Sequence, residues 1–114
     1  MKTSTALTLF ETLSSGVRLE IFRLLVRHTP QGLVAGEIAS ALHIASTNLS
    51  FHLKSMTHAG LISVEQEGRY QRYRVSLNCI EELIGYLTEE CCAGHPEQCR
   101  TISIPDINRQ DPTQ

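Results

Sequence analysis

The chain has 114 residues, of which 41% are apolar and 19% are charged, and it carries a formal net charge of −2. This length fits one domain with one modest core, and no run of about eighteen apolar residues occurs, which argues against a membrane helix. The N-terminus also lacks an apolar run of signal-peptide length, so we expect a cytoplasmic protein.

The net charge hides an asymmetry along the chain. Residues 1–80 carry eight Lys and Arg against five Asp and Glu, whereas residues 81–114 carry two against seven. A mildly basic body with an acidic end permits nucleic-acid binding but does not require it, because the local placement of cations matters more than their total.

Two amphipathic helices are predicted within the first thirty residues. The first starts near Ala6 and is interrupted by Ser14-Ser15-Gly16. Ser15 is a candidate N-cap for the second helix, which ends before Thr29-Pro30. The apolar residues with helical spacing are Ala6, Leu9, Phe10 and Leu13 in the first helix, and Val17, Ile21, Leu24 and Leu25 in the second.

Two further helices are predicted after a turn. One covers residues 33–42 and the other runs from Ser46 to about His58, and residues 43–45 form a tight link between them. Gly60 fits the left-handed residue that often follows the end of a helix. The positions expected to face the core are Ile38, Ala39 and Leu42 in the third helix, and Leu49, Leu53 and Met56 in the fourth.

A hairpin and a last helix complete the predicted domain. In LISVEQEGRYQRYRVS, β-branched and aromatic residues flank Glu67-Gly68, which predicts two antiparallel strands joined by a tight turn. Asn78 is a candidate cap for the last helix, with Glu81 three positions on. Its apolar stripe is Ile80, Leu83, Ile84 and Leu87. We expect a folded domain over residues 1–93 and a mobile tail over residues 94–114.

The order of these elements is typical of a winged helix-turn-helix, a mainly helical fold with a small β-hairpin wing. In that fold the second helix of the motif enters the DNA major groove while the wing follows the backbone. The chemistry suits this role, although polar residues at a helix start are also common caps and hairpin arginines are often only solvated. The candidate DNA contacts are Ser46, Thr47, Asn48, Ser50, Phe51, His52 and Lys54 on the fourth helix, and Arg69, Arg72 and Arg74 on the wing.

The segments GVRLEIFRLL and STNLSFHLKSMTHAGLISVEQEGRYQRYRV closely resemble the ArsR/SmtB family of metal-responsive repressors, over roughly residues 10–92. The resemblance implies a homodimeric repressor of double-stranded operator DNA, in which the first and last helices pair the subunits and an inducer causes release. Carried over by position, the DNA contacts implied by the family are Ser46, Thr47, Ser50, Phe51 and Arg69.

Two inducer sites that occur in the family are missing from this sequence. The third helix contains LVAGE where many arsenite sensors carry a Cys-Val-Cys motif, and residues 78–90 lack the histidines of the zinc-sensing members. The stretch CCAGHPEQC, residues 91–99, instead resembles a smaller arsenite-responsive branch that has a vicinal cysteine pair and a third cysteine shortly after it.

Three cysteines match the coordination of As(III) or Sb(III), which are soft ions that bind three thiolates. Cys91, Cys92 and Cys99 are therefore the expected metal ligands. Gly94 and Pro96 interrupt regular helix between them, which allows the last cysteine to fold back toward the pair. In a reducing compartment, such a cluster indicates metal or redox chemistry more than a disulfide framework.

Alternatives to an arsenite site remain open at this point. His95 would complete a Cys3His set for Zn(II) or cadmium. A thiol redox switch is disfavoured because Glu89 and Glu90 lie beside the pair. Cys91 alone fits a buried apolar position, and Cys79 is assigned to packing. An arsenate reductase of the phosphatase-like type would need Cys-x5-Arg, a spacing that this chain does not have, so we expect no enzyme.

Overall fold

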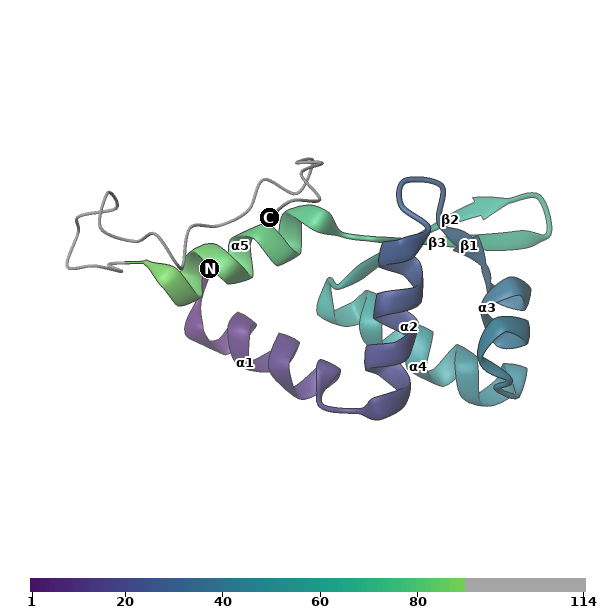
Figure 1. Cartoon of the computed structure of the whole chain (residues 1–114), viewed down its shortest axis with the longest axis horizontal. Helices are drawn as coiled ribbons and strands as arrows, with labels where there is room; N and C mark the ends of the chain where they lie inside the picture. The colour runs from purple at the N-terminus through teal and green to yellow at the C-terminus, as the bar shows by residue number, and fades with distance from the viewer. Residues whose placement is uncertain (90–114) are drawn as a thin grey trace, which may run out of the picture.

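The computed structural model of the chain describes residues 1–89. In this part, five helices and a three-stranded antiparallel sheet form a winged helix-turn-helix, which confirms the predicted fold class (Figure 1). The predicted boundary between residues 93 and 94 lies outside the described residues. The elements are α1 (Thr3–Leu13), α2 (Gly16–Arg27), β1 (Leu33–Val34), α3 (Ala35–Leu42), α4 (Ser46–Ala59), β2 (Ile62–Glu67), β3 (Tyr70–Val75) and α5 (Leu77–Thr88).

The first two helices form where the apolar spacing predicts them. Ser15 caps α2, because its side-chain oxygen accepts a hydrogen bond from the backbone N–H of Arg18 at 3.3 Å. In α1 the core-facing positions are Ala6, Leu9 and Thr12. Phe10 belongs to the predicted apolar stripe, but it is 44% exposed. Part of the apolar stripe of α1 is thus left uncovered by the rest of the domain.

The prediction of a third helix from Leu33 is wrong at its start. Leu33 and Val34 form the short strand β1, which pairs with Tyr73 and Arg72 of β3, and α3 begins only at Ala35. A two-residue strand has no periodicity of its own, and its partner lies about forty residues further along the chain. The predicted two-stranded hairpin is therefore a three-stranded sheet with the order β1-β3-β2.

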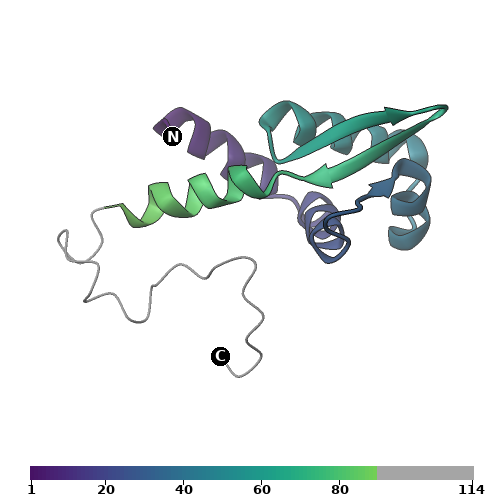
Figure 2. The same cartoon turned by 90° about the horizontal axis from the view of Figure 1, so that it is seen from above.

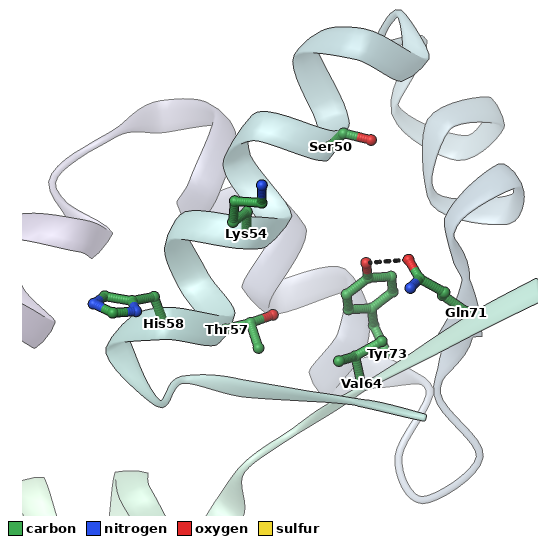
Figure 3. Close-up of a pocket in the computed structure, with 7 residues that line it drawn as sticks. All are labelled: Ser50, Lys54, Thr57, His58, Val64, Gln71 and Tyr73. Atoms are coloured by element: carbon green, nitrogen blue, oxygen red, sulfur yellow. Dashed lines mark hydrogen bonds between the residues drawn. The ribbon is translucent and has the colours of Figure 1, made fainter. Parts of the chain in front are cut away.

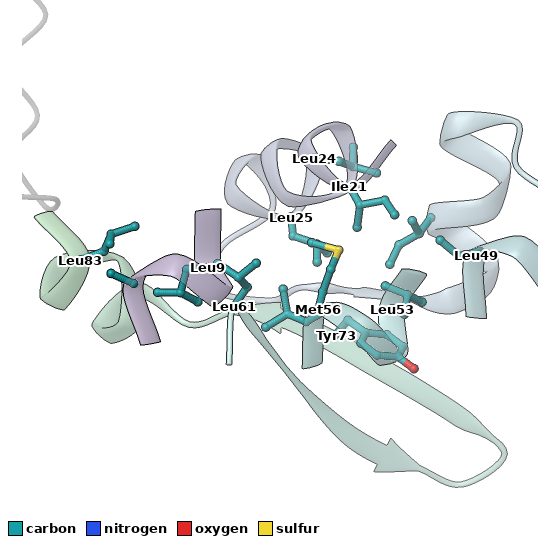
Figure 4. Close-up of a cluster of buried hydrophobic side chains, with 13 residues drawn as sticks. Leu9, Ile21, Leu24, Leu25, Leu49, Leu53, Met56, Leu61, Tyr73 and Leu83 are labelled. Carbon is teal, nitrogen blue, oxygen red and sulfur yellow. The ribbon is translucent and has the colours of Figure 1, made fainter. Parts of the chain in front are cut away.

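The helix-turn-helix motif is formed by α3 and α4 and is held from behind by α2. His43, with a φ of 55°, follows α3, and Gly60, with a φ of 92°, follows α4, so the predicted left-handed stop at Gly60 is confirmed. Figure 4 shows side chains from α2 and α4 meeting in one apolar cluster. Its most deeply buried members are Leu9, Ile21, Leu25, Ile38, Leu49, Leu53, Met56 and Leu61.

The wing extends away from this core as a narrow ribbon (Figure 2). β2 and β3 pair in register from Ile62 opposite Val75 to Glu67 opposite Tyr70, and Gly68 lies in the turn with a φ of 62°. Within the wing only Ile62 and Tyr73, near its base, are buried against the core. The tip of the wing is therefore exposed on all sides.

The last helix, α5, starts one residue before the predicted cap. Ser76 is the N-cap in place of Asn78, since its side chain accepts a hydrogen bond from the backbone N–H of Cys79 at 3.4 Å. α5 lies beside α1 at the end of the molecule opposite the wing (Figures 1 and 2), and the hydroxyls of Thr3 and Tyr86 are 2.6 Å apart. Leu83 is buried, whereas Leu87, also expected to face the core, is 57% exposed.

No helix within residues 1–89 is both long and apolar enough to cross a membrane.

Candidate nucleic-acid interface

The helix α4 has one buried face and one exposed face. Leu49, Leu53 and Met56 anchor it in the core, which turns the opposite side of the helix outward. Phe51 is 69% exposed on that side, so its ring is accessible to a binding partner. The predicted contact residues that the structure leaves exposed on α4 are Ser46, Thr47, Asn48, Ser50, Phe51 and Lys54.

His52 has a different environment from the other predicted contacts on α4. It is half-buried, and its Nδ1 lies 3.1 Å from the Nη1 atom of Arg18 on α2. Its ring also meets that of Phe51 edge to face, with ring centroids 5.9 Å apart. The side chain of His52 therefore faces α2 and does not lie on the outward face of α4.

The wing carries three arginines, and the structure separates one of them from the other two. Arg72 pairs with Glu67 at 2.9 Å, and Arg74 pairs with Glu65. Both guanidinium groups also donate to backbone carbonyls of the loop before β1. Arg69 lies exposed in the turn, and within residues 1–89 its side chain makes no hydrogen bond or ion pair by the usual geometric criteria. The free cation of the described wing is thus at its tip.

A groove of about 490 Å³ separates α4 from the wing (Figure 3). Lys54 and His58 line this groove from α4, and Gln71 and Tyr73 face them from β3. The Tyr73 hydroxyl donates a hydrogen bond to Oε1 of Gln71 at 3.1 Å, which orients the amide. The full lining is Ser50, Lys54, Thr57, His58, Val64, Gln71 and Tyr73.

Sequence reasoning missed part of this groove. Thr57, His58 and Gln71 were not among the predicted contacts, although Ser50, Lys54 and His58 follow one another at four-residue spacing and so share one face of α4. That spacing is a signal that the sequence contains. The contribution of Gln71 has no comparable signal, because it depends on how the wing packs against α4.

The cysteines divide into one inside the described residues and three outside them. Cys79 is half-buried in the first turn of α5 and packs against the core, which confirms its assignment to packing. Burial raises the pKa of its thiol, and the nearby carboxylate of Glu82 raises it further. The predicted ligands Cys91, Cys92 and Cys99 lie outside the described residues. Within residues 1–89, no three His, Cys, Asp or Glu side chains gather as a metal site.

Known proteins similar to this chain fit the same architecture. A family model described as a helix-turn-helix domain matches residues 13–65. An uncharacterized HTH-type transcriptional regulator of Bacillus subtilis, YdfF, is 43% identical over 54 residues. That match covers 44% of this chain and 24% of YdfF, so this chain spans about a quarter of the curated relative.

Two solved structures are similar over most of their length. HlyU from Vibrio cholerae is 26% identical with a TM-score of 0.64, and the match covers 81% of this chain and 99% of HlyU. A homodimeric winged helix-turn-helix DNA-binding domain from Mycobacterium bovis, a possible ArsR-family transcriptional regulator, is 24% identical with a TM-score of 0.61. That match covers 81% of this chain and 85% of the domain.

The fold and these similarities define the class of this protein. The chain is a winged helix-turn-helix protein of the kind found in transcriptional regulators. Within that class it is similar in sequence and structure to HlyU from Vibrio cholerae.

Proposed function

We propose that this protein is a transcriptional repressor that binds double-stranded operator DNA as a homodimer and leaves it when an inducer binds. In this proposal α4 enters the major groove and the wing reaches the adjacent backbone. The observation that carries the proposal is the exposed face of α4, with its small polar side chains and Phe51, placed beside a wing whose free cation is Arg69.

The chemistry of α4 suits a DNA groove. Ser46, Thr47 and Ser50 are short donors and acceptors that reach base edges or phosphates with little loss of side-chain entropy. Phe51 presents an apolar ring that can contact a thymine methyl group. Lys54 lines the groove between α4 and the wing, and Arg69 lies in the turn at the tip of the wing. In this proposal both cations contact DNA phosphates.

Dimerisation through α1 and α5 is the second part of the proposal. Leu7, Phe10 and Leu87 are 56%, 44% and 57% exposed, respectively, and they lie on the two helices farthest from the wing. A partner subunit that covers this apolar surface would bury the apolar side chains that α1 and α5 expose. The similar domain from Mycobacterium bovis is homodimeric, which supports a dimer but does not identify its interface. A two-fold dimer would read an inverted repeat whose half-sites are about one helical turn apart, or a small multiple of that.

The third part of the proposal is the inducer. We propose that As(III) or Sb(III) is bound by the thiolates of Cys91, Cys92 and Cys99, which follow α5 in the sequence. Because α5 lies beside α1, a ligand held near the end of α5 would act directly on the proposed dimer interface. A coupling in the usual range changes operator affinity about 5- to 150-fold.

Fluorescence anisotropy of the reduced protein on DNA from upstream of its own gene tests the proposal. We expect saturable binding that weakens with salt, and release by arsenite but not by zinc. If the protein stayed on DNA with arsenite but left it with zinc, the result would indicate a Cys3His zinc site that includes His95. Release by a thiol oxidant alone would indicate a redox switch, and an absence of DNA binding would overturn the repressor function itself.

A further inference from the structure

Arg18 connects three helices through one guanidinium group. Its Nε donates a hydrogen bond to the carbonyl oxygen of Thr12 near the end of α1 at 2.7 Å. Its Nη1 lies 3.1 Å from Nδ1 of His52 on α4. Arg18 itself belongs to the first turn of α2, where its backbone N–H donates to the Ser15 cap. One side chain therefore links the end of α1 to the middle of α4.

The chemistry of this link determines the state of His52. A guanidinium group has five N–H donors and no acceptor, and it stays charged at all relevant pH values. Nδ1 of His52 must therefore accept the hydrogen bond, which requires a neutral ring with its proton on Nε2. A protonated ring would place a second N–H, and a second positive charge, against the guanidinium group.

Arg18 also provides a hydrogen-bond donor for the backbone carbonyl of Thr12, near the end of α1. Thr12 is one residue from the end of α1, where backbone carbonyls have no partner within the helix and carry the negative end of the helix dipole. A cation donor at this point satisfies such a group. The same cation then fixes the distance between the end of α1 and the ring of His52, next to the exposed Phe51.

We propose that Arg18 is a positioning residue that couples α1 to the DNA-reading helix α4, by holding His52 as the neutral Nε2–H tautomer. The geometry assigns no direct DNA contact to Arg18. Its effect on DNA binding passes through His52, which orients α4 and the adjacent Phe51. The DNA part of this inference rests on the proposed function, whereas the tautomer part does not.

The tautomer is tested first, on the full-length wild-type protein without DNA. Nitrogen-15 NMR of the histidine rings distinguishes a bare Nδ1 from a protonated one, and His52→Gln identifies the signal of residue 52 among the five histidines. We expect Nε2–H with Nδ1 as an acceptor at pH 8. A ring with its proton on Nδ1 would overturn the inference whether or not the protein binds DNA.

A double-mutant cycle on DNA affinity then tests the coupling. Arg18→Gln alone is expected to weaken operator binding by about 2- to 150-fold, the range for residues that are coupled by direct contact. In a His52→Ala background the same change should have little further effect. Additive losses would show that Arg18 does not act through His52 and would overturn the coupling.

Arg23→Gln is the matched control, because Arg23 is an exposed arginine on the same helix. It removes the same charge and should leave both the His52 signal and the operator affinity unchanged. Thermal unfolding of each variant separates loss of fold from loss of positioning. If Arg23→Gln lost as much operator affinity as Arg18→Gln, the loss would be due to the change in net charge. That result would overturn the inference.

Discussion

The guanidinium group of Arg72 lies 2.9 Å from the carboxylate of Glu67 within the wing. Arg74 pairs in the same way with Glu65. Exposed pairs of this kind contribute little to stability, but each acidic partner cancels most of the field that its arginine would present to a phosphate. The attraction of the wing for a DNA backbone is therefore concentrated at Arg69.

Arg69→Ala should weaken DNA binding by a similar factor on all sequences and should make the affinity less dependent on salt. One lost phosphate contact lowers the slope of log affinity against log salt by about 0.9. The measurement is anisotropy on specific and random duplexes between low and physiological salt. The matched control is the double variant Arg72→Gln, Glu67→Gln, which leaves the net charge of the wing unchanged and should leave the slope unchanged. Equal slopes for Arg69→Ala and the wild type would remove Arg69 from the phosphate contacts.

Phe10→Glu should convert the proposed dimer to monomers. Phe10 is exposed in the single chain, so the substitution costs the isolated fold little, whereas a charge at the centre of an apolar interface would be desolvated in both subunits. We expect the dimer dissociation constant to rise at least about 30-fold, as measured by analytical ultracentrifugation. Val26→Glu, at a similarly exposed position on α2, is the control. An unchanged dissociation constant in Phe10→Glu would exclude α1 from the interface.

Gly32→Ala should destabilise the domain by roughly 2 kcal/mol or more. Gly32 has a φ of 74°, and a Cβ at this position would collide with the backbone carbonyl of Tyr73 in β3. Gly36→Ala is the matched control, because Gly36 is helical and a Cβ there meets no atom within 4 Å. Gly36→Ala should stabilise by about 0.5–1 kcal/mol. Chemical denaturation measures both variants, and equal stability of the two would contradict the close approach of this loop to β3.

The cysteine series separates the proposed inducer site from the packed thiol. Cys92→Ser and Cys99→Ser should leave operator affinity intact and abolish release by arsenite. Cys79→Ser should retain the response, because burial raises the pKa of the Cys79 thiol and keeps it in the protonated form. Anisotropy with increasing arsenite measures the response of each variant. A Cys99→Ser protein that still responds fully would exclude a three-thiol site.

Much of the fold could be predicted from local patterns. The buried stripes of α2 and α4, the cap at Ser15 and the stop at Gly60 all depend on residues within a few positions of one another. Helical periodicity and capping act over that distance, so a single sequence displays them. The same local reasoning located the exposed side of α4, and with it most of the candidate contacts.

The sequence by itself determined the type and order of the helices, the hairpin and the exposed polar face of α4. Only the tertiary structure decided that Leu33 and Val34 form a strand, that Arg72 is paired while Arg69 is free, and that His52 faces Arg18. It also brought Gln71 and His58 to the same groove. The physical reason is distance along the chain: β-pairing, ion pairs and grooves join segments far apart in sequence, and their partners are defined only once the core has packed.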